Sequence, residues 1–281
     1  MGNSEKEAIK LTKKAYEIRK IIVETAQKTG GAHYGGAMSC VDILTCLYFK
    51  ILRIDPKNPS WDERDRFILS AGHKNAALAP ILAERGYFPK ELLDTFNQLG
   101  SSLGIHPYTT TPGVELSTGS LGHGLSCGVG MALAAKLKKM DFRVFVLMGD
   151  GEVMEGTVWE AAMAASHYKL DNIIGIIDRN KLSMDGPTEE IMGLEPLAGK
   201  WKEFGWSVRE IDGHNMREIL DTFKAIPFVK GKPSMVIANT VKGKGISFIE
   251  NKYEWHYGLL SSEEEKKAIE ELDKVINSLE E

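Results

Sequence analysis

The chain has 281 residues, of which 43% are hydrophobic and 26% charged, a composition typical of a globular protein rather than a disordered or fibrous one. Its 35 basic and 39 acidic residues give a formal charge of −4 without a long basic run, so we expect no nucleic-acid partner. No apolar run approaches the roughly 20 residues of a membrane span, so we expect no membrane partner either. Three cysteines without close spacing and a charged N-terminus without a signal peptide predict a reducing, cytoplasmic compartment.

The first segment predicts a long amphipathic helix. Ser4 and Glu7 have the spacing of a capping box, and apolar residues recur at helical intervals up to a stop at Gly30. A second helix is expected over residues 41–52, with Ser39 near its cap.

The middle of the chain alternates between apolar runs and helical patterns. The expected strands cover residues 66–70, 143–148, 173–177, 207–211 and 234–239. The expected helices among them cover residues 121–138, 157–167, 197–204 and 216–226. Continuous apolar strands separated by helices indicate parallel strands covered on both faces. We therefore predict an α/β fold, a doubly wound and mostly parallel sheet with helices on both faces.

The end of the chain predicts one more helix, at about residues 262–280, with apolar residues on a single face. Because no internal repeat or low-complexity linker interrupts the sequence, residues 1–281 are expected to form a single domain.

The strongest chemical signal is Gly149-Asp150-Gly151 at the end of one expected strand, followed by Asn180 after the next. Consecutive parallel strands place these ends side by side, where such sheets bind ligands. Their oxygens suit magnesium, and the glycines would let a diphosphate approach the backbone near the helix that Gly156 opens. Alone, Gly-Asp-Gly is equally compatible with a simple turn after a strand.

The surrounding stretch, residues 148–186, resembles the thiamine-diphosphate motif as transketolases carry it, and the resemblance extends over nearly the whole chain. It continues in Ser70-Ala71-Gly72-His73, Gly104-Ile105-His106-Pro107, Ser117-Thr118-Gly119-Ser120-Leu121-Gly122-His123-Gly124 and Lys242-Gly243-Lys244-Gly245, followed by His256.

The resemblance implies that the chain binds thiamine diphosphate and Mg²⁺, with the metal held by Asp150, Asn180 and the main-chain carbonyl of Leu182. The residues implied to bind the cofactor are His73, Ser120, Leu121, Gly122, Gly149, Asp150, Gly151, Glu155 and Asn180.

The family also uses several active-site histidines, and His33, His73, His106 and His256 fall at the matching positions. A lone loop histidine is usually an exposed or capping residue, but these four lie in glycine- or proline-rich loops at motif positions. Imidazoles that titrate near neutrality could orient a ketose, carry its hydroxyl proton and stabilise an alkoxide. We assign His33 and His256 to substrate carbonyl and alkoxide oxygens, and His73 and His106 to hydroxyl contacts.

Glu155 matches a family glutamate in a chain of carboxylates that links paired sites across a subunit interface. The alternative is a helix-start glutamate stabilised by the helix dipole. His167 and His214 are expected to be structural, and His123 stands where many relatives have glutamine.

Two features depart from the family pattern. His33 lies in Ala32-His33-Tyr34-Gly35-Gly36, where full-length relatives usually have glycine and proline around the histidine. The chain also ends about where a full-length transketolase begins its pyrimidine-binding domain, which carries the glutamate that activates the cofactor and most phosphate-binding groups. We therefore expect a partner, a C-terminal transketolase subunit, with two copies of each chain and sugar phosphates as substrates.

The predicted function is that of the N-terminal subunit of a split transketolase, which transfers a two-carbon ketol unit from a ketose phosphate to an aldose phosphate. Alternatives are the same half of a deoxyxylulose-phosphate synthase-like or dihydroxyacetone synthase-like enzyme, and a non-catalytic subunit that only binds a partner. We disfavour a dinucleotide-binding protein because the glycines lack the Gly-x-Gly-x-x-Gly spacing.

Overall fold

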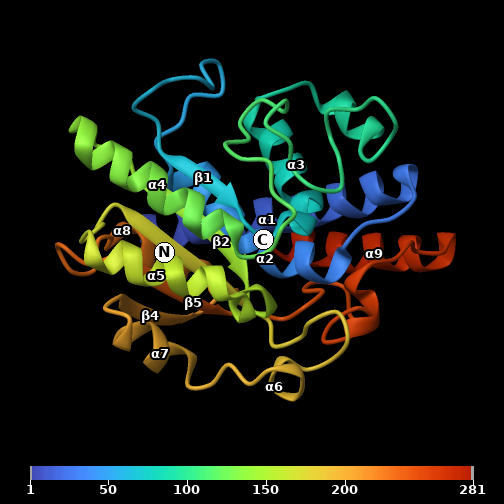
Figure 1. Ribbon diagram of the computed structural model, residues 1–281. Coiled ribbons are helices and arrows are strands. Elements are labelled where there is room, and N and C mark those ends of the chain that lie inside the picture. Colours follow the sequence, from blue (N-terminus) through green and yellow to red (C-terminus); the bar gives the residue numbers. More distant parts are fainter. Residues whose placement is uncertain (1, 280–281) are drawn as a thin grey trace.

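The computed structural model describes residues 2–279 and contains a five-stranded sheet in the order β1-β2-β3-β5-β4, with every neighbouring pair parallel (Figure 1). The strands are β1 (Arg66–Leu69), β2 (Val144–Gly149), β3 (Ile173–Arg179), β4 (Ser207–Asp212) and β5 (Ser234–Asn239). All five strands expected from the sequence are confirmed, and so is the parallel α/β fold class.

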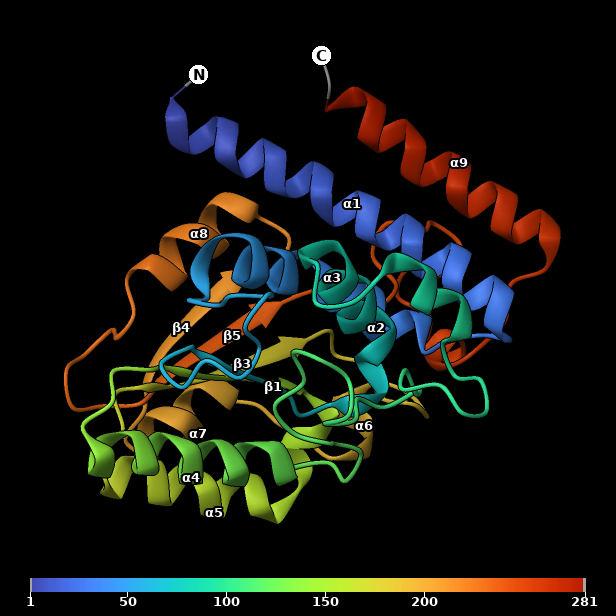
Figure 2. The same cartoon turned by 90° about the horizontal axis from the view of Figure 1, so that it is seen from above.

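Helices cover both faces of the sheet, as Figure 2 shows from above. One face carries α1 (Asn3–Thr29), α2 (Tyr34–Cys46), α3 (Asn75–Arg85), α8 (Met216–Lys224) and α9 (Ser262–Ser278). The other carries α4 (His123–Lys138), α5 (Gly156–His167) and α7 (Leu197–Glu203). The short helix α6 (Thr188–Ile191) lies in the connection that follows β3.

The two faces have separate hydrophobic cores because side chains alternate along each strand. In β2, Phe145 and Leu147 join the core beneath α1 and α2, whereas Val144 and Val146 join the core beneath α4 and α5. All residues of β2 and β3 are buried. This double burial explains why these strands read as unbroken apolar runs in the sequence.

The expected capping box at the N-terminus is wrong. Helix α1 begins at Asn3, its N-cap is Gly2, and no side chain caps it. Glu7 instead forms ion pairs with Lys50 and Lys224, both of which are far from it in the sequence. The stop at Gly30 is confirmed, since Gly30 adopts a left-handed conformation with φ 91° and closes the helix.

The second expected helix is shifted. Helix α2 begins at Tyr34 rather than near residue 41, and a π-helical turn, Leu47–Ile51, continues it. Ser39 is therefore inside the helix, not at its cap, and its hydroxyl donates a hydrogen bond to Asp178 at 2.5 Å. Helix α3 was not predicted.

The expected C-terminal helix is confirmed as α9, which begins with a capping box between Ser261 and Glu264. Residue 280, the end of the expected range, lies outside the described residues.

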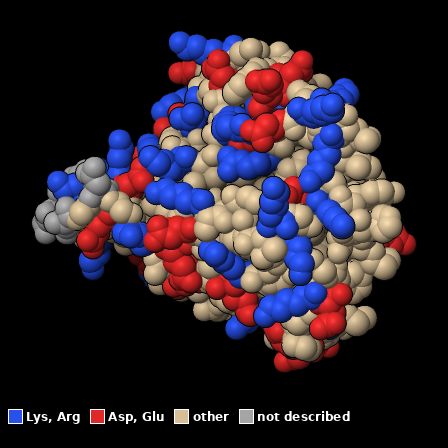
Figure 3. Space-filling view, turned by 90° about the vertical axis from the view of Figure 1, so that its left-hand side faces the viewer, with Lys and Arg blue, Asp and Glu red and all other residues tan. Residues whose placement is uncertain are grey.

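In the described part of the chain, no helix has the length and apolar character needed to cross a membrane. Basic and acidic side chains are interspersed on the face in Figure 3.

Candidate active site

The sequence motif residues meet in a cavity of about 350 Å³ at the carboxyl ends of β2 and β3. Asp150 directly follows β2 and Asn180 directly follows β3, and Gly149 pairs with Asp178 in the sheet register. The predicted residues that line the cavity are His73, Leu121, Gly149, Asp150, Gly151, Asn180, Leu182 and His256. Residues His33, His106, Ser120, Gly122 and Glu155 lie outside its lining.

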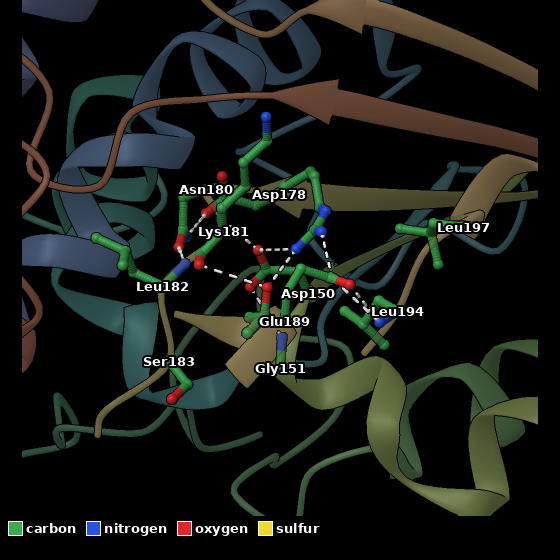
Figure 4. Close-up of polar contacts among 12 residues, drawn as sticks. Asp150, Gly151, Asp178, Asn180, Lys181, Leu182, Ser183, Glu189, Leu194 and Leu197 are labelled. Carbon is green, nitrogen blue, oxygen red and sulfur yellow. Dashed lines mark hydrogen bonds and ion pairs between the residues drawn. The ribbon is translucent and has the colours of Figure 1, made fainter. Parts of the chain in front are cut away.

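Asp150 is 2% exposed, and its carboxylate is held by main-chain and side-chain donors (Figure 4). Oδ1 accepts a hydrogen bond from Gly151 N at 2.8 Å, and Oδ2 accepts from Lys181 N at 2.6 Å and from the Arg179 guanidinium at 3.2 Å. Burial and the nearby charge of Asp178 raise the pKa of Asp150. A cation bound beside Asp150 would counteract this rise in pKa, because a positive charge favours the ionised carboxylate.

The other two expected metal ligands, Asn180 and Leu182, are two residues apart in the connection after β3. Asn180 Oδ1 accepts from Leu182 N at 3.1 Å, while its amide nitrogen donates to Asp178 Oδ2 at 3.3 Å. The amide orientation thus leaves the oxygen on the side of Leu182. The carbonyl of Leu182 accepts from the ammonium of Lys242 at 3.2 Å, so a cation already lies against it.

These donors fit a hard cation with a diphosphate. They supply a carboxylate, an amide oxygen and a carbonyl, which are the oxygen ligands that Mg²⁺ prefers. A Cβ added at Gly149 or Gly151 would meet protein atoms only at 3.6 Å or beyond, so protein packing does not require glycine at either position. The missing side chains therefore leave room that a ligand can use.

A buried ion pair that the sequence did not predict lies next to these donors. Lys74 is 2% exposed and Asp178 is fully buried, and they form an ion pair beside Gly149. Ser39 and Thr240 also donate to the Asp178 carboxylate. Lys74 follows a motif histidine, but the sequence alone contains no sign that its side chain turns inward.

Lys242 is a second cation of the cavity that was not predicted as a site residue. Its ammonium donates to the carbonyls of Leu182 and Ser183, and it lies 3.2 Å from His256 Nδ1. Burial and the charge of Lys74 lower the pKa of Lys242 to about 8. The feature of the sequence that could have indicated this role is that Lys242 begins the Lys-Gly-Lys-Gly motif.

Three of the four predicted histidines form a compact cluster. The ring centroids of His33, His73 and His256 are 5.3–5.4 Å apart in every pair. His106 makes no ring contact with them in the described structure, although its protonated form adds to the lowering of the pKa of His33 and His73 that burial mainly causes. The structure thus brings three of the residues together and leaves His106 at the margin.

The cluster corrects the expectation that these imidazoles titrate near neutrality. Burial, with added repulsion from neighbouring cations, lowers the pKa of His33 and His256 to about 4 and that of His73 to about 2. At pH 7 all three rings are therefore neutral. Each can donate one hydrogen bond and accept another, which suits contacts to hydroxyl and carbonyl groups.

Glu155 is exposed and occupies the N-cap position of α5 without making a side-chain cap hydrogen bond. Its side chain packs near Gly122, where an added Cβ would lie 2.8 Å from Glu155 Cβ. Three residues before Glu155, Glu152 is buried, and the sequence did not predict it as a site residue.

A parallel sheet that presents oxygen donors and glycines at adjacent strand ends is typical of α/β proteins that bind anionic cofactors. The chain belongs to the transketolase family: residues 11–273 match the family model described as the thiamine diphosphate binding domain of transketolase. This match confirms the predicted family and, with the relatives below, the predicted subunit type.

Two similar proteins are named as single subunits of transketolases. The chain is 47% identical to an apulose-4-phosphate transketolase subunit from Phocaeicola vulgatus, over 93% of either chain. It is also 47% identical to the 6-deoxy-6-sulfo-D-fructose transketolase subunit SqwG of Clostridium sp., over 95% of this chain and 97% of that one. The transketolase structure from Campylobacter jejuni superposes with a TM-score of 0.88 at 34% identity, covering 94% of this chain and 42% of that one.

Proposed function

We propose that this chain binds the diphosphate of thiamine diphosphate through Mg²⁺ and, together with a C-terminal partner subunit, transfers a two-carbon ketol unit from a ketose phosphate to an aldose phosphate. The observation that carries the proposal is the convergence of Asp150, Asn180 and Leu182 at one cavity in a chain of the transketolase family. Asp150, Asn180 and the Leu182 carbonyl would hold the metal.

The bound cofactor supplies the carbanion and the electron sink for cleaving and forming carbon–carbon bonds. The remaining work belongs to this chain's own residues. His73 and His256 line the cavity as neutral rings, and His33 contacts both. We assign His33 and His256 to substrate carbonyl and alkoxide oxygens, and His73, with His106, to hydroxyl contacts.

Lys242 keeps the His256 ring in place. Its ammonium lies beside Nδ1, so that nitrogen serves as the acceptor and the proton resides on Nε2. Nε2–H is then free to donate to an alkoxide oxygen of a bound sugar. Glu155 stays our candidate for the carboxylate chain across the subunit interface, because its exposed position allows contact with another chain.

A partner chain is supported by the exposed apolar residues beside the cavity. Leu121, Met184 and Ile191 line the cavity and are 37%, 60% and 46% exposed, and Met192 is 60% exposed. Side chains of this kind around one site indicate a surface that another protein covers. Both relatives are named as one subunit of a transketolase, which supports the same proposal; we propose two copies of each chain.

The test is calorimetric titration of thiamine diphosphate in the presence of Mg²⁺, on the chain itself and on Asp150→Ala. We expect binding by the unchanged chain and none by the variant, because the substitution removes the carboxylate ligand of the metal. The control is Asp212→Ala, which removes an exposed carboxylate at the end of β4. Equal affinity of all three proteins would contradict the metal assignment.

A further inference from the structure

Glu152 is only 2% exposed, and its carboxylate links three segments that meet at the cavity. We propose that Glu152 is a positioning residue, which holds the turn before α4 against the end of β2 and so prepares the cavity for the cofactor's diphosphate. The inference rests on the proposed function for the identity of the cofactor.

The geometry shows how one carboxylate makes these links. Oε1 accepts hydrogen bonds from the hydroxyl of Ser70, at the end of β1, and from Gly122 N at 2.8 Å. Oε2 accepts from Gly149 N, the last residue of β2, at 3.0 Å. The 3-10 helix Gly151–Met154 turns the Glu152 side chain back toward Gly149.

The turn before α4 has little freedom to move away from this anchor. Gly122 is the N-cap of α4, adopts φ 80°, and lacks a side-chain cap hydrogen bond. A Cβ at Gly124 would lie 2.3 Å from the Ser70 hydroxyl oxygen, so the first turn of α4 packs directly on Ser70. The buried carboxylate thus satisfies a main-chain amide at a helix start that offers no other cap.

The same turn contributes Leu121 to the cavity, and Gly149 contributes the adjacent wall. If the turn were not held, ordering it would consume part of the free energy of cofactor binding. Another link, donated by the Thr118 hydroxyl to the Leu69 carbonyl at 2.7 Å, lies earlier in the loop and does not reach the turn itself.

A carboxylate is required because all three partners donate. The amide of Glu152→Gln has a single acceptor oxygen, and its NH₂ group would face a donor. We therefore expect Glu152→Gln to leave the Gly122 or Gly149 amide unsatisfied. Its dissociation constant for thiamine diphosphate, at saturating Mg²⁺, should rise about tenfold.

Asp65→Asn is the matched control. Asp65 is 1% exposed and likewise accepts from two main-chain amides, those of Arg53 and Arg143, each at 2.9 Å. It lies just before β1, at the amino ends of the strands, whereas the cavity lies at their carboxyl ends. Asp65→Asn should lower the midpoint of thermal unfolding but leave the dissociation constant within about twofold, because distant sites act independently.

The experiment measures thermal unfolding, calorimetric affinity for thiamine diphosphate with Mg²⁺, and amide hydrogen exchange of the peptide spanning residues 118–125. In Glu152→Gln this peptide should exchange faster without cofactor and regain protection when cofactor is added. Ser70→Ala, which removes one of the three donors to Glu152, should show a smaller change of the same kind. It replaces Glu152→Gln as the test if that variant does not fold.

Unchanged exchange of this peptide, or an affinity loss no larger than that of Asp65→Asn, would overturn the proposal. A wild-type chain that does not bind thiamine diphosphate would refute the proposed function. The exchange comparison would still decide whether Glu152 orders the turn.

Discussion

In the histidine cluster, burial sets the protonation state of each ring and thereby its chemical role. Depressed pKa values keep His33, His73 and His256 neutral at pH 7, so they act as hydrogen-bonding groups and not as fixed charges. The positive charge of this region is carried instead by Lys74 and Lys242. Under the proposed function, this division would let lysines attract the anionic cofactor while neutral rings contact the sugar.

We expect His256→Ala to retain its affinity for thiamine diphosphate while turnover, measured with a partner subunit, falls about 100-fold or more. The reason is that the ring is assigned to substrate oxygens and not to the metal. Calorimetry and a ketol-transfer assay on the same preparation separate the two effects. Full turnover would place His256 outside the reaction, and a variant that fails to fold would favour a structural role.

At this scale the sequence predicted residues whose position follows from a strand end, such as Asp150 and Asn180. It did not predict Lys74, Glu152 or Arg179, although each is adjacent to a motif residue. Their importance depends on burial and on partners distant in the chain: Lys74 pairs with Asp178, and Glu152 accepts from Ser70 and Gly122. Sequence spacing does not contain those contacts.

At the scale of elements, a buried network joins α1, α2 and the start of α8. Arg19 of α1 donates to Asp42 of α2 at 2.6 Å, and His214 lies 2.7 Å from the same carboxylate. The second nitrogen of His214 accepts from Val241 N at 2.8 Å. His214 therefore links this helix pair to the segment after β5, in keeping with the structural role expected for it.

The network predicts a pH-dependent stability. Burial alone would raise the pKa of Asp42, but Arg19 and His214 outweigh it and lower the pKa from 3.8 to about 2. The stabilisation is therefore present above about pH 4 and is lost as pH falls toward 2. We expect Asp42→Asn to lower the free energy of unfolding by about 3 kcal/mol at pH 7, because Arg19 stays buried without its partner.

Urea unfolding followed by circular dichroism at several pH values checks this expectation. The difference between Asp42→Asn and the unchanged protein should narrow between pH 4 and pH 2. The control is Asp273→Asn, which breaks a surface pair between α9 and Lys20 of α1 and should cost less than about 1 kcal/mol. If the difference in free energy of unfolding between Asp42→Asn and the unchanged protein were the same at every pH, the link between Asp42 ionisation and stability would be refuted.

The sequence located strands better than helix boundaries for a physical reason. Strands buried on both faces leave long apolar runs, as in β2 and β3. Helix α3 was missed because it is built largely from small apolar residues and contains Pro80, which normally argues against a helix interior. Ser39 was misplaced because its hydroxyl serves a distant carboxylate rather than a helix end.

At the scale of the molecule, the chain spans 42–46% of the solved transketolase chains that it resembles, but 93–97% of the two relatives named as subunits. This pattern supports the proposal that a second chain completes the site. The fold and family could be predicted from motifs within this sequence, whereas the substrate could not, because groups that bind the sugar's terminal phosphate are expected on the partner. The single-domain organisation stays a prediction.

The central claim is that this chain holds one half of the active site and turns over only with its partner. The most direct measurement is a ketol-transfer assay with thiamine diphosphate and Mg²⁺, using xylulose 5-phosphate and a panel of other ketose phosphates with ribose 5-phosphate as acceptor. It is run on the purified chain, on a C-terminal transketolase subunit, and on both together. We predict that neither chain alone forms product and that the mixture does, because cofactor activation needs a carboxylate against the pyrimidine ring that we place on the partner. Substantial activity of the single chain, free of host transketolase, would contradict the account.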